Sequence, residues 1–324
     1  MLNSDQILSK VNEAIAVIQY PTRPTGLYEP IEYVLSIGGK RIRPVMMLLT
    51  AQALGTDIDK VMPAAIGIET YHNYTLLHDD LMDRADMRRG MPTVHRKWDS
   101  NTAILSGDSM LVLACKHILS TQLPNIREAM DTFITTALEI GEGQQYDMNF
   151  ETRTDVTQDE YIEMIRLKTS VLIACAAKMG AILSDATPTV AGQLYKYGEQ
   201  IGLAFQLQDD LLDVYGDPKV FGKRIGGDIL CNKKTFLLIN AFQLANARQL
   251  AELTRWTTAT DYDEEQKIAA VTDIYNQLNI KIITADKINH YFMEAQRTLS
   301  SISLSPEGKQ SLHDFALSLI NRSY

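Results

Sequence analysis

The stretch Asp79-Asp80-Leu81-Met82-Asp83 recurs in pattern further along the chain as Asp209-Asp210-Leu211-Leu212-Asp213. In an α-helix, residues four positions apart lie on one face, so the first and last aspartates of each cluster form a pair of neighbouring carboxylates. Such a pair repels itself unless a cation binds there. Carboxylate oxygens suit Mg²⁺, which usually takes its remaining ligands from water and substrate phosphates. The two clusters therefore predict a magnesium and diphosphate site.

Apolar residues flank both clusters. Leu76 and Leu77 precede the first, and Phe205 and Leu207 precede the second. Aspartate pairs are also common on solvated helix surfaces, but these carboxylates lie on helices that bury much of their surface. A charge so close to a core needs a partner, which favours the functional interpretation.

The rest of the sequence predicts an all-α fold. Apolar residues recur at spacings of three and four, for example at Leu48 and Leu49 after Val45, whereas strand-like alternation is scarce. We expect roughly twelve helices. No linker rich in Gly, Ser or Pro divides the chain, and the two clusters must face one cavity to share a ligand. Residues 1–324 are therefore predicted to form a single domain, a large helical bundle around a central cavity.

Composition narrows the class of protein. The net charge of −9, with no run rich in Lys or Arg, argues against nucleic-acid binding. The three cysteines are widely spaced and the N-terminal residues lack the features of a signal peptide, so we expect a cytoplasmic protein. The most apolar stretches, 103–119 and 169–183, contain Asp108, Lys116 and Lys178, so no transmembrane segment is expected.

Fixed cations bracket the first cluster. Gly38-Gly39-Lys40-Arg41-Ile42-Arg43-Pro44 precedes it, and Arg88-Arg89-Gly90 follows it. Together these motifs resemble the trans-isoprenyl (polyprenyl) diphosphate synthases, most closely those that make geranylgeranyl or farnesyl diphosphate. The family's second aspartate motif corresponds to residues 202–213 and its lysine loop to residues 222–235. The resemblance spans residues 38–235 in the family's order and implies the isoprenoid-synthase fold.

The resemblance implies a role for each motif residue. Asp79, Asp83 and Asp209 would bind Mg²⁺, as three ions once the diphosphate is bound, and Asp228 would accept from metal-bound water. The implied catalytic residues, which hold the allylic diphosphate or lie beside its reacting carbons, are Asp79, Asp80, Asp83, Arg88, Lys168, Thr169, Gln206, Asp209, Asp210, Asp213, Lys223 and Lys233. The implied isopentenyl diphosphate site comprises Gly39, Lys40, Arg43, His72 and Arg89.

Simpler interpretations exist for single members of this set. A lone Lys or Arg is usually a solvated surface residue, and His72 by itself is more typical of helix packing. Lys168 precedes an apolar run, so its side chain could simply extend from a buried helix toward water. The joint occurrence of the motifs favours the functional roles.

The activity that the resemblance implies is a magnesium-dependent prenyl transfer by ionisation, condensation and elimination. Isopentenyl diphosphate would attack an allylic diphosphate (dimethylallyl, geranyl or farnesyl) to give a C15 to C20 trans-polyprenyl diphosphate, with geranylgeranyl diphosphate favoured. The released diphosphate is a candidate for the final proton acceptor. The family is commonly homodimeric, so a homodimer is expected.

Product length in this family depends on the residues before the first aspartate, here Tyr74 and Thr75. An aromatic side chain five positions before Asp79, with no insertion in the motif, resembles enzymes that make C20 or sometimes C15 products. On a helix Thr75 lies about 40° from Asp79 and Tyr74 about 140° away, so Tyr74 could also be a core residue. Tyr71, one turn earlier, is a further candidate for the floor of the pocket.

Two alternatives stay open at this point. A class I terpene cyclase ionises the same kind of substrate, but its second metal site normally mixes Asn, Ser or Thr with Glu instead of Asp209-Asp210-Leu211-Leu212-Asp213. A non-catalytic regulatory subunit would keep the helical fold, yet it would not need both aspartate clusters and the lysine loop.

Overall fold

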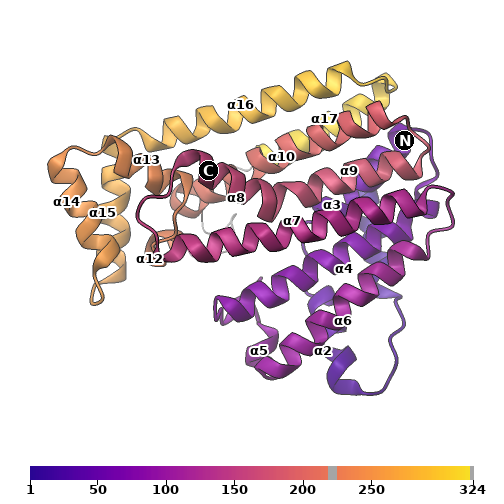
Figure 1. Cartoon of the computed structure of the whole chain (residues 1–324), viewed down its shortest axis with the longest axis horizontal. Helices are drawn as coiled ribbons and strands as arrows, with labels where there is room; N and C mark the ends of the chain where they lie inside the picture. The colour runs from indigo at the N-terminus through magenta and orange to yellow at the C-terminus, as the bar shows by residue number, and fades with distance from the viewer. Residues whose placement is uncertain (218–224, 322–324) are drawn as a thin grey trace. The chain divides into compact units, whose positions relative to one another are not determined.

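The computed structural model describes residues 1–217 and 225–321, and nearly all of their regular structure is helical (Figure 1). The all-α prediction is confirmed. Within the described residues, the α-helices outnumber the roughly twelve expected, partly because α5 (Val94–Lys97) and α12 (Gly227–Leu230) are single turns that the apolar periodicity does not reveal. The chain divides into two compact units, and each is described by itself.

The first unit comprises Met1–Thr135, Cys175–Tyr195 and Leu299–Phe315. Its complete elements are α1 (Ser4–Ala16), α2 (Thr25–Ser36), α3 (Ile42–Ala53), α4 (Ile58–Met82), β1 (Met87–Arg88), β2 (Met91–Pro92), α5 and α6 (Ser100–Leu119). It also holds the start of α7 (Ile126–Thr152), the end of α9 (Val171–Leu183), the start of α10 (Pro188–Tyr215), the end of α16 (Ile280–Ser301) and most of α17 (Pro306–Ile320).

Helix α3 forms the centre of the first unit. It is apolar on every side, and its residues Val45 to Ala51 are buried throughout. Helix α4 packs against α3 and against α6, and α4 and α6 run side by side (Figure 1). Asp57 and Asp99 cap the first turns of α4 and α6 by accepting from backbone amides, which explains where both helices begin.

Helix α6 alone, among the described residues, is long and apolar enough to cross a membrane, with a mean hydropathy of 1.3. This property reflects length and composition only, and core helices of soluble proteins share it. Within the first unit α6 packs against α4 and α2.

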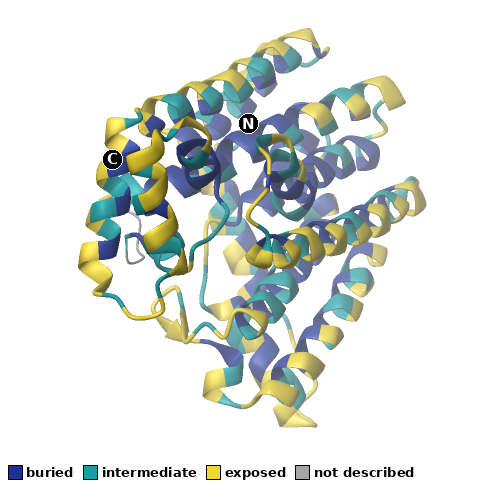
Figure 2. Ribbon diagram, turned by 60° about the vertical axis from the view of Figure 1, so that its left-hand side comes forward, coloured by how far each residue is buried: buried dark blue, intermediate teal, exposed yellow. Residues whose placement is uncertain are grey.

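The second unit comprises Thr136–Ala174, Lys196–Thr298 and Ala316–Tyr324. Besides its parts of α7, α9, α10, α16 and α17, it holds α8 (Gln158–Ile165), the π-helical turn η1 (Arg166–Ser170), α12, α13 (Phe236–Leu244), α14 (Ala247–Thr258) and α15 (Glu264–Gln277). Its core gathers apolar side chains from α8, α10, α13 and α15, such as Leu207, Leu237 and Tyr275. Figure 2 shows helices with one buried and one exposed side, as amphipathic sequences require.

Candidate active site

The first aspartate cluster lies at the C-terminal end of α4. The helix ends at Met82, and the backbone amide of Asp83 donates to the carbonyl oxygen of Asp79 at 2.9 Å, so the two carboxylates are one turn apart as the spacing predicts. Asp83 is exposed and Asp79 is partly exposed. Carbonyl groups at this end of a helix already carry partial negative charge, so carboxylates here repel the helix as well as each other. Cation binding relieves both repulsions, and the hard oxygens fit Mg²⁺.

Asp80 is buried and holds a different partner. Arg88 Nε donates to both carboxylate oxygens of Asp80 at 2.8 Å, and Arg88 Nη2 lies 2.7 Å from Asp80 Oδ1. Burial raises the pKa of Asp80 even though Arg88 lowers it. The same Nη2 lies 3.8 Å from Asp79 Oδ2. Asp80 therefore fixes the guanidinium of Arg88 beside the exposed carboxylates, where it can meet an anion.

Arg88 is brought there by a tight hairpin. Strands β1 and β2 pair Arg88 with Met91, and the two residues between them, Arg89 and Gly90, have φ angles of 52° and 76°. Two positive φ angles define the type I′ turn that favours glycine at its second position. The motif Arg88-Arg89-Gly90 is thus a turn that presents two guanidinium groups.

The second guanidinium, Arg89, reaches the loop between α2 and α3. Arg89 Nη1 donates to the carbonyl oxygen of Gly38. A Cβ atom on Gly39, whose φ is 144°, would lie 2.6 Å from Arg89 Nη1, so a larger residue would push the guanidinium away. Lys40 follows in the same loop and is exposed.

Arg43 and His72 form a hydrogen-bonded pair in the first unit. Arg43, in the first turn of α3, donates through Nη1 to His72 Nε2 on α4 at 3.1 Å. Burial, and then the charge of Arg43, lower the pKa of His72 well below its ordinary value, so the imidazole is neutral and accepts this hydrogen bond. Among the residues predicted for isopentenyl diphosphate binding, Arg43 contacts His72, and Arg89 donates to the Gly38 carbonyl oxygen next to Gly39.

Arg41, between Lys40 and Arg43, was given no role from the sequence. It has a φ of 46° and is buried, with Nη1 2.7 Å from Glu69 Oε1 and Nη2 donating to the carbonyl oxygen of Leu35 at 2.6 Å. Glu69 on α4 also accepts from Asn73 Nδ2 at 3.0 Å. This buried ion pair anchors the loop that carries Lys40. A glutamate on the apolar side of a helix is the sequence signal that could have revealed it.

The second aspartate cluster lies near the C-terminal end of α10 in the second unit. Asp209 is partly exposed, whereas Asp210 and Asp213 are buried. The Tyr161 hydroxyl on α8 donates to Asp210 Oδ2, and Gln206 Nε2 donates to Asp210 Oδ1 at 3.0 Å. Burial, and then the charge of Asp228, raise the pKa of Asp210 to about 7.

Asp213 contacts the backbone of the loop that follows. Its Oδ2 accepts from the amide of Asp228 at 2.9 Å, and its carbonyl oxygen accepts from the amide of Gly226 at 2.6 Å. In the second cluster, Asp209 is the most exposed member, while Asp213 ties α10 to the segment that carries Asp228.

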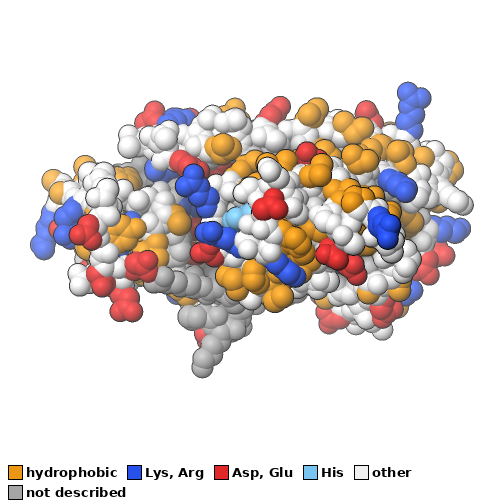
Figure 3. All heavy atoms as spheres, turned by 90° about the horizontal axis from the view of Figure 1, so that it is seen from below, with side chains coloured by type: hydrophobic (Ala, Val, Ile, Leu, Met, Phe, Trp, Pro, Cys, Tyr) orange, Lys and Arg blue, Asp and Glu red, His pale blue; other side chains and the backbone are white. Residues whose placement is uncertain are grey.

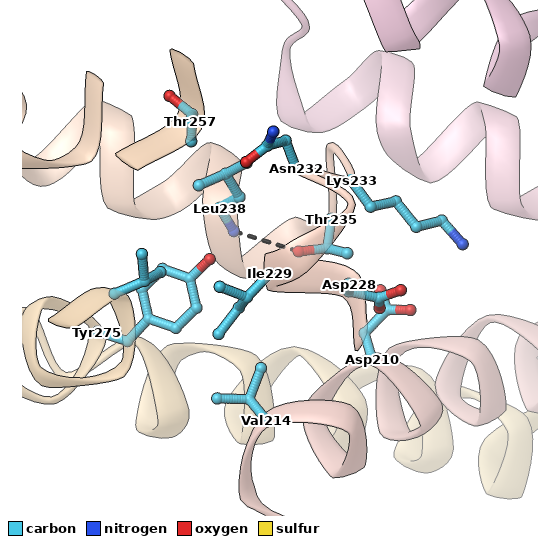
Figure 4. Close-up of a pocket in the computed structure, with 11 residues that line it drawn as sticks. Asp210, Val214, Asp228, Ile229, Asn232, Lys233, Thr235, Leu238, Thr257 and Tyr275 are labelled. Carbon is cyan, nitrogen blue, oxygen red and sulfur yellow. Dashed lines mark hydrogen bonds between the residues drawn. The ribbon is translucent and has the colours of Figure 1, made fainter. Parts of the chain in front are cut away.

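A small cavity in the second unit, of about 10 Å³, is lined by Asp210, Asp228 and Lys233 together with apolar residues of α13 and α15. Figure 4 shows the carboxylates of Asp210 and Asp228 next to one another on the side of the cavity toward which Lys233 extends. The predicted Lys223 lies outside the described residues.

Lys168 and Thr169 project from the π-helical turn η1. Lys168 Nζ lies 2.6 Å from Asp147 Oδ2 on α7, and the Thr169 hydroxyl donates to Gln206 Oε1 at 3.0 Å. Burial alone would raise the pKa of Asp147, but the charges of Lys233 and Lys168 lower it overall. Asp147, as the partner of Lys168, is a candidate site residue that the sequence does not reveal, because a single aspartate in a polar stretch of α7 carries no distinctive spacing. π-Turns of this kind are frequent at functional sites.

Two of the three residues predicted to set product length, Tyr71 and Tyr74, belong to an aromatic cluster in the first unit. The buried Tyr71 ring contacts Tyr74, with centroids 5.4 Å apart, and packs edge-on against Phe133 of α7 at 5.1 Å. The partly buried Tyr74 contacts the His78 ring at 4.8 Å. Thr75 donates its hydroxyl to the carbonyl oxygen of His72 at 2.8 Å.

The described residues contain no group of three or more His, Cys, Asp or Glu side chains that could hold a metal ion without other ligands. The carboxylates that fit Mg²⁺ by chemistry and exposure are Asp79 and Asp83 in the first unit and Asp209 in the second.

Comparison with known proteins identifies the family. The polyprenyl synthetase family model matches residues 24–275. A geranylgeranyl diphosphate synthase from Methanosarcina mazei is 46% identical over 237 residues, which is 72% of this chain and 73% of the relative. A geranylfarnesyl diphosphate synthase from Natronomonas pharaonis is 36% identical and covers 97% of this chain and 95% of its own. A crystal structure of a geranylgeranyl pyrophosphate synthase has a TM-score of 0.95 and 42% identity over 100% of both chains.

The chain belongs to the polyprenyl synthetase family, and the predictions of a trans-isoprenyl diphosphate synthase and of its all-α fold are confirmed. It is therefore a prenyltransferase of isoprenoid biosynthesis.

Proposed function

We propose that this enzyme condenses isopentenyl diphosphate with an allylic diphosphate and makes geranylgeranyl diphosphate as its main product. The observation that carries the proposal is the end of α4, where two carboxylates one turn apart lie beside a guanidinium that Asp80 holds in place. This arrangement matches a substrate whose leaving group is a diphosphate. Mg²⁺ held by Asp79, Asp83 and Asp209 would supply charge neutralisation for that leaving group.

The diphosphate-binding residues of each unit have separate tasks in this proposal. Arg88 in the first unit, with Lys168 and Lys233 in the second, binds the allylic diphosphate and stabilises the charge that develops as its carbon–oxygen bond breaks. Lys40, Arg43, His72 and Arg89 bind isopentenyl diphosphate, whose double bond then attacks the allylic cation. The diphosphate released from the allylic substrate accepts the proton lost in the elimination.

In this proposal both aspartate clusters bind the same allylic diphosphate, and residues 1–324 fold as a single domain. The match to the family supports both statements, because the structure of a geranylgeranyl pyrophosphate synthase aligns with the whole of this chain. The preferred starter is dimethylallyl, geranyl or farnesyl diphosphate, and the enzyme works in the cytoplasm.

A homodimer is also part of the proposal. Leu105, Val112 and Leu119 recur every seven residues along α6 and are exposed, Val112 by 68%. Such a stripe leaves an apolar helix side in water, which a second copy of the chain would cover. Figure 3 shows apolar side chains gathered in patches, with charges of both signs between them, on the face that it views.

An assay with labelled isopentenyl diphosphate, Mg²⁺ and each allylic starter tests the proposed reaction. A prenyltransferase incorporates the label into a longer diphosphate. A terpene cyclase would consume the allylic substrate without incorporating label, and a regulatory subunit would do neither.

Asp79→Ala should lower kcat by about a hundredfold or more under saturating magnesium, because it removes a group that neutralises the leaving diphosphate. Asp86→Asn is the matched control, since Asp86 is an exposed aspartate near the same helix end that pairs with Arg96 on the surface. A near-normal rate for Asp79→Ala would contradict the metal role.

A further inference from the structure

Lys267 on α15 is a fully buried lysine, with 0% of its surface exposed. Lysine is almost never buried to this extent unless it has partners, because removing an ammonium group from water is costly. Burial lowers the pKa of Lys267 from its ordinary value. Helix α15 lies beyond the sequence motifs, and the reaction proposed above makes no use of this cation.

The two hydrogen-bond acceptors of Lys267 lie around the end of α12, and its aromatic partner Tyr262 lies just before α15. Lys267 Nζ donates to Asn232 Oδ1 at 2.7 Å and to the carbonyl oxygen of Leu230 at 3.2 Å, and it lies 4.2 Å from the centroid of the Tyr262 ring. The Tyr262 hydroxyl donates to the same carbonyl oxygen at 3.3 Å. The lysine therefore ties α15 to the chain directly before Lys233.

That part of the chain sets the direction of Lys233. Asn232 has a φ of 55°, which turns the backbone sharply, and the amide of Lys233 then donates to the carbonyl oxygen of Asp228 at 2.9 Å. Two residues later Thr235 caps α13 by accepting from the amide of Leu238 at 3.3 Å. Figure 4 shows Lys233 extending from this turn on the side where Asp210 and Asp228 lie.

An apolar side chain at position 267 would have a lower desolvation cost on burial, but it could not donate to Leu230 and Asn232.

We propose that Lys267 is a positioning residue, which braces the turn at Leu230–Asn232 so that Lys233 is held in the direction required to bind the allylic diphosphate. This inference rests on the proposed role of Lys233. A long lysine side chain has many rotamers, so its placement depends on how firmly its backbone is held.

Lys267→Met tests the brace, since methionine is unbranched and similar in length but cannot donate. We expect KM for the allylic diphosphate to rise on the order of tenfold, the lower end of what loss of an orienting partner costs in metal sites. KM for isopentenyl diphosphate should stay unchanged, because the residues proposed to bind it belong to the first unit. A purely structural role would lower the melting temperature and leave both KM values as they are.

Asn232→Gly provides a second variant in case Lys267→Met does not fold. Glycine accepts the positive φ and removes the Asn232 Oδ1 acceptor while the Leu230 carbonyl oxygen remains, so a rise in KM for the allylic diphosphate alone is again expected. In the double variant the effect should be smaller than the sum of the two, because both single variants remove the hydrogen bond between Lys267 and Asn232. Tyr262→Phe is the matched control, since it deletes one hydroxyl next to the same carbonyl oxygen and leaves the cation in place.

Lys233→Ala separates failure of this inference from failure of the proposed function. If Lys233→Ala leaves KM for the allylic substrate unchanged, Lys233 does not bind that substrate and the proposed role fails. If Lys233→Ala raises that KM while Lys267→Met and Asn232→Gly leave it unchanged, the positioning role of Lys267 is wrong.

Discussion

At the scale of single residues, the spacing of the aspartates predicted which carboxylates lie one helical turn apart, and α4 has Asp79 and Asp83 in that relation. It could not predict that Asp80 and Asp210 would be buried against internal partners. One of the two partners of Asp210 is Tyr161, which lies on another helix, and only tertiary packing brings these two residues together. Neighbouring aspartates of the same motif thus differ in exposure: Asp79 and Asp209 are partly exposed, whereas Asp80 and Asp210 are buried.

His72 gives a prediction about pH. The folded chain holds His72 neutral, because burial and Arg43 lower its pKa well below the value of about 6.5 expected in the unfolded chain. As the pH falls below about 6.5, His72 becomes protonated in the unfolded state but stays neutral in the folded state. The free energy of unfolding therefore decreases by up to about 1.4 kcal/mol per pH unit. The contribution of His72 is fully present above that pH.

Denaturant unfolding at a series of pH values checks this expectation. His72→Gln should flatten the decrease in unfolding free energy on the acid side, whereas His290→Gln, at an exposed histidine on α16, should not. The same slope in wild type and His72→Gln would mean that His72 is protonated in the folded protein.

At the scale of elements, apolar periodicity predicted helices, and capping residues such as Asp57 and Asp99 explain where α4 and α6 begin. The π-turn η1 was not foreseen, because its residues Arg166–Ser170 continue an ordinary helical pattern. Gly202 of α10 lies directly against Ser170, and a Cβ atom there would be 2.6 Å from the Ser170 Cα. The turn therefore depends on a neighbouring helix that a local pattern does not contain.

The ion pair between Arg41 and Glu69 ties the α2–α3 loop to α4, and each side chain is only 2% exposed. Glu69→Leu should lower the free energy of unfolding by about 3 to 5 kcal/mol, because it leaves the Arg41 guanidinium buried without its counterion. Denaturant unfolding measures this change. The double variant Arg41→Met/Glu69→Leu should recover part of the loss, and a single variant as stable as the wild type would contradict the buried pair.

The aromatic cluster on α4 leads to a prediction about product length. Tyr74→Ala should shift products beyond C20, because it removes a ring from the proposed floor of the pocket. Chromatography of labelled products detects the shift, with Thr75→Ala and Tyr71→Ala tested in parallel. Unchanged products from Tyr74→Ala and longer products from Tyr71→Ala would place the floor one turn earlier, where Tyr71 packs against Phe133.

At the scale of the whole molecule, the motifs predicted the family and the fold class without any knowledge of tertiary structure. Residues that hold the motifs in place, such as Arg41, Asp147 and Lys267, were not predicted, because their roles follow from contacts between segments far apart in the chain. Each is an ordinary charged residue when viewed in the sequence alone.

The exposed stripe on α6 gives a prediction about assembly. Val112→Glu should convert a dimer into monomers, because a carboxylate in the centre of an apolar interface is costly to bury. Analytical ultracentrifugation measures the mass, and Glu128→Gln on α7 is a control at a polar position. A wild-type mass equal to one chain would rule out the dimer.

The aspartates near the C-terminal ends of α4 and α10 place like charges against the negative ends of their own helices. Selection for stability alone would favour lysine or a neutral residue at these positions, because positive charge stabilises the C-terminal end of a helix. If the aspartates act as proposed, we expect a trade-off between stability and activity: substitutions that remove negative charge at these helix ends should stabilise the fold and lower the reaction rate.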